Sequence, residues 1–329
     1  MKPRQGRTQR GAALLSAMIT VTLVATLAAT ALWQQWRGVE VEAAERARVQ
    51  SSWLLNGALD WARLILRIDH SFNVDHLAEP WAVPLAEARL STFLAASEAD
   101  TETDRDAFLS GQIVDLQSRL NVRNLVGRQK QELIANLERF ERLFSLLQLP
   151  RSELGALVDN LRSALDAEAA GITTLPDPLM PQRVSQLVWL GLSPATVQAL
   201  GPYVTVLPVR TPVNLNTASA QVIHAVVPAL SLAQAQQLVT ARSQQYFSSV
   251  GDAMQRVGAP ADAVAGCADW CSVNSRCFEV RARLRLDDVA LEEVAWVQRR
   301  GARQPVDVLW RQRVPLSLAA DAISGPGQR

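Results

Sequence analysis

Residues 11–36 read GAALLSAMITVTLVATLAATALWQQW and contain no charged side chain. A bilayer core of about 30 Å needs about 20 apolar residues of helix, so this stretch is long enough to span a membrane. The residues before it carry Lys2, Arg4, Arg7 and Arg10 and no acid. Cations on that side favour a cytoplasmic N-terminus, and we therefore expect the bulk of the chain on the other side of the membrane.

The chain beyond residue 36 continues the helical pattern into polar sequence. Apolar side chains recur at roughly helical spacing, with Glu and Arg opposite them, at Trp36, Ala43, Ala47, Trp53, Ala58, Trp61, Ile65 and Ile68. No Pro occurs in residues 4–79. The periodicity predicts one helix that crosses the membrane over residues 12–36 and continues into water over residues 37–69. Its tryptophans are expected to pack on the sheet of their own chain and on partner helices; they are Trp33, Trp36, Trp53 and Trp61.

The alternative for this region is a secretory signal peptide that is removed. Ala29-Thr30-Ala31 would serve as its small-x-small cleavage site. The apolar run is longer than the 7–15 residues of such a region, however. A removed peptide also has no reason to stay in register with a later amphipathic helix. The anchor is therefore the favoured interpretation.

Length and charge limit the classes of function. The 329 residues suffice for two domains. The 33 basic and 32 acidic residues give a net charge of +1, which loss of the leader would turn negative. Nucleic-acid binding demands a strongly basic face, so this composition does not favour it. The sequence has no Gly-rich phosphate loop or nucleophile elbow, and we expect no enzyme.

A basic leader, a Gly, and a hydrophobic helix that runs into an amphipathic one resemble the type IV pilin-like proteins. The resemblance implies that a prepilin peptidase removes residues 1–11 by cutting after Gly11. Ala12 would then be the new N-terminus, which this family usually N-methylates.

The fifth mature position departs from the common pilin pattern. Most members carry Glu there, and by the resemblance that Glu pairs with the N-terminal amine of the adjacent subunit. This chain has Ser16, which has no charge to offer such an amine. Absence of the Glu is typical of the K-type minor pseudopilin of type II secretion, so the resemblance narrows to that family.

Two further blocks resemble the K pseudopilins. The first is residues 111–125, GQIVDLQSRLNVRNL, and the second is residues 211–219, TPVNLNTAS. The residues that stand at the family's motif positions are Asp115, Arg119, Asn121, Asn124, Asn214, Asn216 and Thr217. The second block leads into two expected helices, Gln221–Val227 and Ala233–Arg242, with Thr217 or Ser219 as the N-cap of the first.

The second block also resembles the helix-hairpin-helix module of DNA-binding proteins. Such hairpins use glycine so that backbone amides can approach phosphate. Here the hairpin, Pro228 to Leu232, has no glycine, and Pro228 has no amide to donate. Arg242 is the only basic residue other than His224 in the two helices. A periplasmic DNA-binding module remains the alternative function, and we favour the scaffold without a phosphate site.

The remaining patterns predict an α+β fold. Helical stripes fill residues 129–170 and 187–200, and alternating strands fill 278–298, with a turn at Asp287-Asp288, and 305–314. By the resemblance this is a pilin-like long N-terminal helix on an antiparallel sheet with a large inserted all-α domain. The predicted segments are a leader 1–11, a transmembrane helix 12–36, its continuation 37–69, a first pilin-like part 70–128, an insert 129–275, strands 276–316 and a disordered tail 317–329.

The three cysteines lie close together in the sequence. Cys267, Cys271 and Cys277 suit a disulfide with one thiol left over, if the domain is in an oxidising compartment. Two cysteines four apart on a helix are poorly placed to bond, so a pair that involves Cys277 is preferred. Zinc is not favoured because a fourth ligand is missing.

A cofactor is not expected. K pseudopilins usually carry a calcium loop that resembles Asp-Trp-x-Asp-x-Asp followed by Gly-Ala-Glu-Asp, and this loop is not found in the chain. Calcium takes six to eight oxygen ligands, and Asp177 is a weak candidate for only one of them.

The resemblance implies a structural and assembly protein of the inner membrane, with a single span, a cytoplasmic N-terminus and a periplasmic bulk. It would be a minor pseudopilin that initiates and caps the short periplasmic filament of a type II secretion system. Its expected partners are the other minor pseudopilins of the filament tip, prepilin peptidase and the inner-membrane secretion platform, with no nucleic acid.

Overall fold

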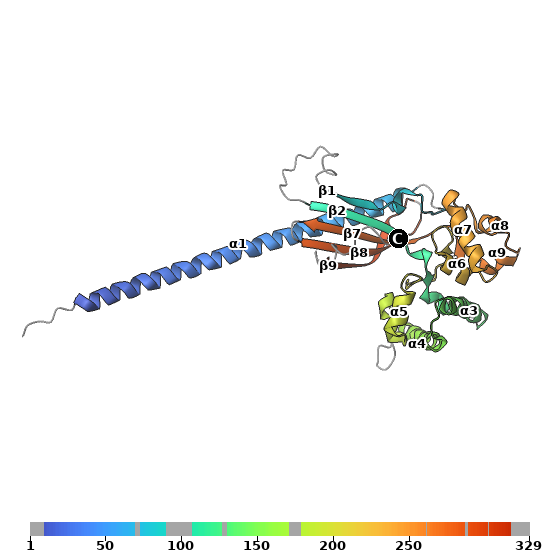
Figure 1. The fold of residues 1–329 in the computed structure, drawn as a ribbon, viewed down its shortest axis with the longest axis horizontal. Coiled ribbons are helices and arrows are strands. Elements are labelled where there is room, and N and C mark those ends of the chain that lie inside the picture. The colour runs from blue at the N-terminus through green and yellow to red at the C-terminus, as the bar shows by residue number, and fades with distance from the viewer. Residues whose placement is uncertain are drawn as a thin grey trace, which may run out of the picture. The chain divides into compact units, whose positions relative to one another are not determined.

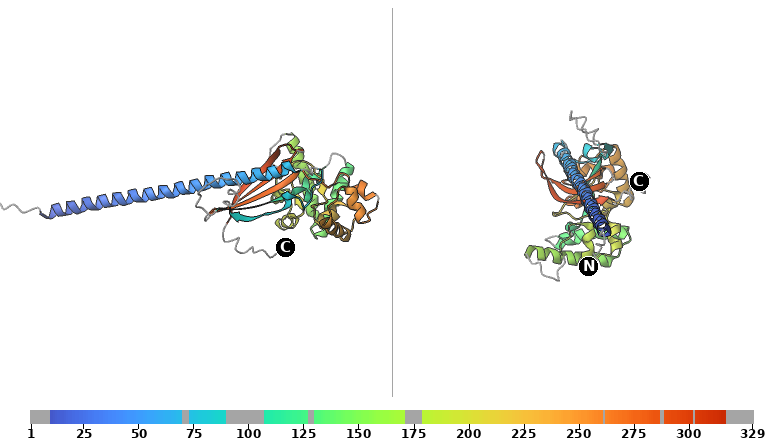
Figure 2. Two further views of the ribbon diagram at one scale, coloured as in Figure 1. Left: turned by 90° about the horizontal axis from the view of Figure 1, so that it is seen from above. Right: turned by 90° about the vertical axis from the view of Figure 1, so that its left-hand side faces the viewer.

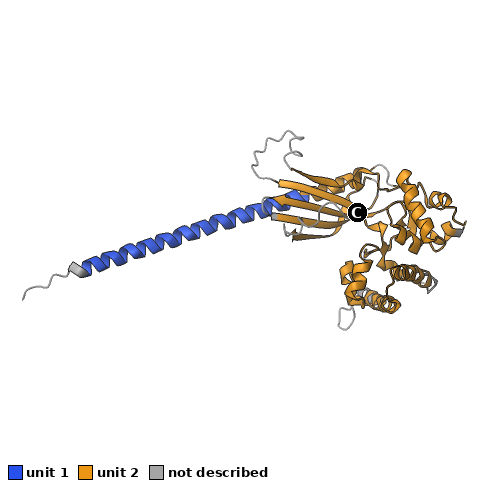
Figure 3. Cartoon of the chain, viewed as in Figure 1, with its two compact units in different colours: residues 1–56 blue, residues 57–329 orange. Residues whose placement is uncertain are grey.

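The computed structural model describes residues 10–69, 73–89, 107–126, 130–170, 179–260, 262–286, 289–301 and 303–316. The chain divides into two compact units, Met1–Asn56 and Gly57–Arg329 (Figure 3). The expected start of the leader, the turn at Asp287-Asp288, the tail 317–329 and Asp177 lie outside the described residues.

The first unit is helical. Helix α1 spans Arg10–Ile68, begins in this unit and ends in the second. It contains a window with a mean hydropathy of 2.1, and by length and composition it can cross a membrane. The hydroxyls in its apolar part donate to carbonyl oxygens three or four residues earlier, as Thr26 does to Leu23 O at 2.9 Å and Thr30 to Leu27 O at 2.8 Å. These polar groups are therefore satisfied inside the helix, as a lipid environment requires.

The second unit contains one antiparallel sheet of five strands (Figure 1), in the order β1-β2-β7-β8-β9. The strands are β1 Leu85–Arg89, β2 Ala107–Asp115, β7 Cys277–Leu286, β8 Val289–Arg299 and β9 Val306–Leu316. Strands β2 and β7 pair along nine positions although about 160 residues separate them. The chain thus leaves the sheet at Asp115 and returns at Cys277, and the helices lie between these points.

The C-terminal part of α1 packs on one face of the sheet (Figure 2). Leu59, Ala62 and Leu66 are buried there against apolar strand residues that include Phe278 and Val280. Full burial of a leucine contributes about 1.5–3 kcal/mol, so this face anchors the helix. Trp61 points elsewhere and is 51% exposed. The expectation that Trp61 packs on its own sheet is wrong, because the buried positions 59, 62 and 66 lie on the other side of the helix.

The insert consists of short helices around an apolar core. Its longer helices are α3 Lys130–Leu146, α4 Arg151–Ala170 and α7 Leu232–Gln244. The shorter helices are α5 Pro194–Leu200, α6 Ala220–Val226, α8 Val250–Arg256 and α9 Asp262–Cys267, with the 3₁₀ helices η2 Leu116–Ser118, η3 Val122–Leu125 and η4 Val184–Leu190. Serine side chains cap α5, α6, α7 and α8, and Ser219 is the cap of α6.

Two short parallel ladders join distant parts of the insert. Strand β3, Leu120–Asn121, pairs with β4, Val204–Thr205. Strand β5, Val213–Asn214, pairs with β6, Cys271–Ser272. Each ladder contains an asparagine from one of the two sequence blocks, Asn121 in β3 and Asn214 in β5.

The α+β fold class predicted from the sequence is confirmed. The predicted helices and the strands of 278–314 are present. Strand β1 and the 3₁₀ helix η1, Pro80–Ala82, were not predicted individually, because residues 70–110 carry too many Pro and polar residues to show a clear period.

Candidate site at the junction of sheet and insert

Asp115 lies at the centre of a buried polar network where the insert leaves the sheet. It is the last residue of β2 and is 3% exposed. Its Oδ2 accepts hydrogen bonds from Ser275 Oγ at 2.6 Å, Thr217 Oγ1 at 2.6 Å and Asn214 Nδ2 at 3.3 Å, and its Oδ1 accepts one from Gln117 N at 2.7 Å. Burial raises the pKa of Asp115, while these donors stabilise the carboxylate. The Asp115 side chain therefore links the sheet to three segments of the insert, at Gln117, Thr217 and Ser275.

Asn214 and Asn216 extend this network into the insert. Asn214 Nδ2 also donates to the carbonyl oxygen of Asp75 at 3.1 Å, and its Oδ1 accepts from Asn216 N at 2.9 Å. Asn216 pairs with the backbone of Phe247 in both directions, at 3.0 and 2.8 Å. Both asparagines are almost fully buried. Their side-chain amides supply hydrogen bonds to backbone groups that have no regular secondary-structure partner.

Asn121 and Asn124 hold the segment before β5 in the same manner. Asn124 Nδ2 donates to Thr211 O at 2.8 Å, and Thr211 N donates to Asn124 Oδ1 at 3.1 Å. Asn121 Nδ2 donates to Val209 O at 2.7 Å, and its Oδ1 accepts from Leu207 N at 3.1 Å. These hydrogen bonds therefore join the two sequence blocks, although about 90 residues of chain separate them.

Arg299 forms a second centre beside the first. This residue ends β8, is 1% exposed, and donates through Nη1 to Asp69 Oδ2 at 2.9 Å and through Nη2 to Asp75 Oδ2 at 2.7 Å. Nη2 also donates to the carbonyl oxygen of Ser275 at 2.8 Å, so Ser275 contacts both centres. Burial outweighs the nearby guanidinium and raises the pKa of Asp75 to about 7.

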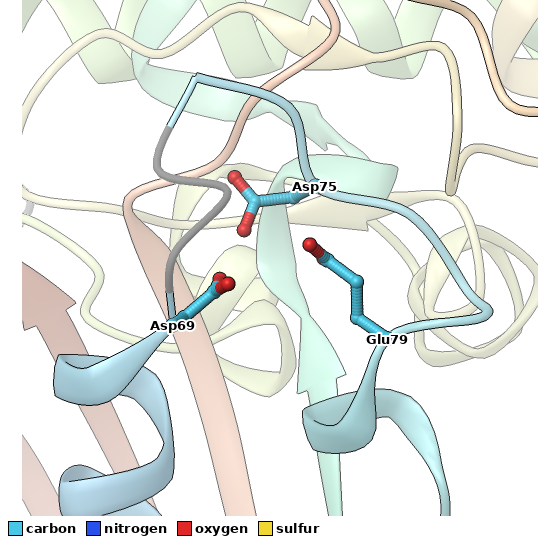
Figure 4. A group of neighbouring side chains, drawn as sticks. All are labelled: Asp69, Asp75 and Glu79. Atoms are coloured by element: carbon cyan, nitrogen blue, oxygen red, sulfur yellow. The ribbon is translucent and has the colours of Figure 1, made fainter.

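Asp69, Asp75 and Glu79 form a group of three carboxylates (Figure 4), in which oxygens lie within 4.8 Å of one another. Such a group has the ligand atoms to hold a cation. Arg299 already supplies positive charge to two of the three, and Glu79 Oε2 accepts from Trp81 Nε1 at 2.6 Å and His76 N at 3.0 Å. The arrangement works as a buried ion-pair cluster that joins the loop after α1 to the end of β8.

Arg119 lies apart from these hydrogen bonds. Its side chain is half-buried near Glu279, and burial lowers its pKa. Of the other six motif residues, four belong to the Asp115 network, and Asn121 and Asn124 bond to the segment before β5. Sequence reasoning missed Asp75, Ser275 and Arg299, since Asp75 and Arg299 are 224 positions apart and carry no local pattern.

The disulfide joins Cys267 to Cys271, with the two Cα atoms 5.3 Å apart. The preference for a pair with Cys277 is wrong. Helix α9 ends at Cys267 and β6 begins at Cys271, so the two cysteines lie across a turn rather than on one helix. Cys277 is a buried thiol at the start of β7, and burial raises its pKa to about 12.

The α6–α7 hairpin uses its cations internally. Arg242 Nη1 donates to the carbonyl oxygens of Leu215 at 2.8 Å and Ala218 at 2.5 Å, and burial lowers the pKa of Arg242 to about 10. Arg142 of α3 donates to the carbonyl oxygen of His224 at 2.8 Å. These side chains hold the hairpin together, and the DNA-binding alternative gains no support from them.

The predicted processing residues lie at the start of α1. Gly11 and Ala12 are both helical, and Ser16 Oγ donates to Ala13 O at 3.0 Å. The hydroxyl of Ser16 is therefore satisfied by its own helix. Cleavage at Gly11 stays a prediction.

A long apolar N-terminal helix whose end packs on an antiparallel sheet, with a helical insert fixed by a buried junction, defines a pilin-like protein. Models of the family "Type II secretion system (T2SS), protein K" match residues 118–209 and 213–268. These ranges include all of the seven motif residues except Asp115. Over these residues, this chain is similar to the type II secretion system protein K family.

Individual relatives agree with this assignment. The type II secretion system protein K of Pseudomonas aeruginosa is 27% identical over 319 residues, which cover 89% of this chain and 90% of that protein. The protein K of Klebsiella pneumoniae is 27% identical over 320 residues, covering 89% and 93%. The crystal structure of the GspK-GspI-GspJ complex from enterotoxigenic Escherichia coli matches with a TM-score of 0.64 and 18% identity, covering 82% of this chain and 98% of that one. Family and apolar helix together are consistent with a single-pass inner-membrane protein.

Proposed function

We propose that this protein initiates and caps the periplasmic pseudopilus of a type II secretion system, with its N-terminus in the cytoplasm and its bulk in the periplasm. The observation that carries the proposal is the pairing of a pilin-like frame with Ser16 at the position where most pilins have Glu. A subunit without this carboxylate has no charge with which to pair the terminal amine of a neighbour in lipid.

The insert supports a terminal position. It adds several helices at the end of the sheet where β2 ends and β7 begins, and the junction holds them by buried hydrogen bonds. A rigid addition of this size would hinder stacking of a further subunit on that end. The same rigidity suits a cap, which has to present one fixed surface.

The partners proposed for this chain are other minor pseudopilins, as in the GspK-GspI-GspJ complex of Escherichia coli. Exposed apolar side chains on α1 would contact their helices: Val49 is 53%, Trp53 73%, Trp61 51% and Leu64 49% exposed. Prepilin peptidase would act after Gly11, and the inner-membrane platform would receive the processed chain. This role requires no cofactor, and Asp177, the weak calcium candidate, lies outside the described residues.

The decisive experiment locates the chain in the filament. In cells that assemble long pseudopili, an epitope on the insert is labelled with gold-conjugated antibody and the filaments are imaged. The proposal expects label at one end of each filament, and fewer filaments in a strain that lacks the chain. Label distributed along the filaments would contradict the cap. Mass spectrometry of the purified protein should find Ala12 as the first residue, whereas a start near Leu32 would support the signal-peptide alternative.

A further inference from the structure

A small apolar pocket lies beside the last strand of the sheet. Its volume is about 240 Å³, and it is lined by Leu309 and Trp310 of β9, Trp296 of β8, and Met180 and Pro208 of the insert. Small-molecule sites usually measure about 300–1,000 Å³. A pocket of this size fits one large side chain better than a cofactor.

A β-bulge shapes the pocket. Trp296 pairs with Trp310 and Val297 pairs with Val308, so Leu309 is the extra residue of β9. A bulge redirects side chains, and here both Leu309 and Trp310 line the same pocket. Trp310 packs on Trp296 with ring centroids 5.6 Å apart, which makes the wall rigid.

The apolar surface continues beyond the pocket. The residues next to its lining in the chain are exposed, with Leu179 63%, Val209 49% and Val308 38% accessible, and Leu309 itself is 36% accessible. Exposed apolar residues next to the lining of a pocket favour an interaction site.

The charged side chains that line the pocket or stack on its wall are basic. Arg123 is the only charged residue among the described residues that line it. The guanidinium of Arg183 lies 5.2 Å from the centre of the Trp310 ring and donates to Gln312 Oε1 at 2.6 Å. Asp307, two residues before Leu309, pairs with Arg300. An occupant with negative charge next to its apolar group therefore complements this surface.

Strand β9 offers a backbone edge beside the pocket. It is the outermost strand of the five, and no described strand pairs with its other edge. Pro315 has no amide to donate, so pairing is favoured in the first part of β9, which is the part that contains Leu309 and Trp310. An extended peptide can add to such an edge while one side chain enters a neighbouring pocket.

From these features we propose that the pocket at Leu309 and Trp310 docks an extended acidic segment of a partner protein, which adds to the β9 edge and inserts one aromatic or large aliphatic side chain. This docking is independent of the helix contacts that assemble the filament.

The test uses the full-length protein in detergent and three fluorescein-labelled heptapeptides. The first has a central phenylalanine between two aspartates, the second has lysines for the aspartates, and the third has alanine for the phenylalanine. Fluorescence polarisation should show the first peptide binding at least tenfold more tightly than either of the others. Hydrogen exchange should slow for the amides of Val308 to Gln312 when it binds. Equal binding of all three peptides, or no protection of β9, would overturn the proposal.

Substitutions in the chain complete the test. Leu309→Lys should weaken the first peptide at least tenfold, whereas Val314→Lys, at a site of similar exposure on the same strand, should not. Arg123→Glu should shift the preference from the aspartate peptide towards the lysine peptide, and thermal unfolding identifies any variant that fails to fold. If sedimentation instead shows self-association that Leu309→Lys abolishes, the occupant is a second copy and the proposal fails. Unchanged peptide binding in Leu309→Lys would refute it as well.

Discussion

At the scale of single residues, buried polar side chains determine how the insert joins the sheet. Asp115 and Arg299 each contact segments that are far apart in the sequence, and Ser275 touches both centres. Buried hydrogen-bonded groups of this kind contribute modestly when satisfied but are costly when one partner is removed. The junction is therefore specific, since any other seating of the insert would leave several buried groups without partners.

Asp115→Ala tests this specificity. The change removes the acceptor of the Thr217 and Ser275 hydroxyls and one of the acceptors of the Asn214 amide. We expect a loss of about 2–4 kcal/mol in the free energy of unfolding, since each unsatisfied buried group costs about 1–3 kcal/mol. Urea unfolding followed by circular dichroism measures the effect in the full-length protein. Asp159→Ala, at an exposed position on α4, is the control and should change stability by less than about 0.5 kcal/mol. Similar losses in both variants would show that the junction is not special.

Asp75 predicts a pH dependence. Burial raises its pKa from 3.8 to about 7 in the folded state, so the folded chain binds a proton that the unfolded chain has lost in this range. The stabilisation is complete below about pH 4 and is lost as the pH rises towards 7. Glu79 and Asp115 are shifted in the same direction by burial. Stability should therefore fall from pH 4 to pH 7, and Asp75→Asn should make the slope shallower. A slope that this substitution leaves unchanged would show that Asp75 is not the group responsible.

At the scale of elements, the two faces of α1 differ in burial. Leu66 is fully buried against the sheet, whereas Trp61 is half exposed on the other side. Leu66→Ala should lower the free energy of unfolding by about 2–5 kcal/mol. Trp61→Ala should leave stability within about 1 kcal/mol but reduce co-purification with the other minor pseudopilins. Urea unfolding and pull-down of both variants separate the two effects. Loss of partners in neither variant would argue against α1 as the assembly face.

The elements also show what the sequence could predict. Strands β7 and β8 alternate and the helices of the insert carry apolar stripes, so their local periods identify them. The sequence did not separate the sheet-facing from the exposed positions of α1, because a bulky apolar residue such as Trp61 fits the helical period on either side of a narrow stripe. The pairing of Cys267 with Cys271 depends on where α9 ends, and element ends are the least certain part of any pattern. The contact of Arg299 with Asp75 arises only after the sheet has formed, so no local signal precedes it.

At the scale of the whole molecule, the chain combines a pilin-like frame with two features that support the proposed position at the filament end. The apolar helix and the sheet are those of a pilin-like subunit, and the match to the GspK-GspI-GspJ complex covers 82% of the chain. Ser16 and the insert are the two departures from a plain subunit. The proposed cap role predicts that these departures, rather than the frame, exclude the chain from the filament body.

Restoring the carboxylate separates the contributions of Ser16 and the insert. Ser16→Glu supplies the carboxylate that would pair with a neighbour's terminal amine. Because an unpaired carboxylate in lipid is costly, pairing with a neighbouring subunit should stabilise this variant inside the filament. We expect gold label on the insert to appear along the filament body as well as at its end. Ser16→Ala adds no charge and should keep the label at the end. Label confined to the end in both variants would mean that the insert alone determines the position and that the residue at position 16 does not affect it.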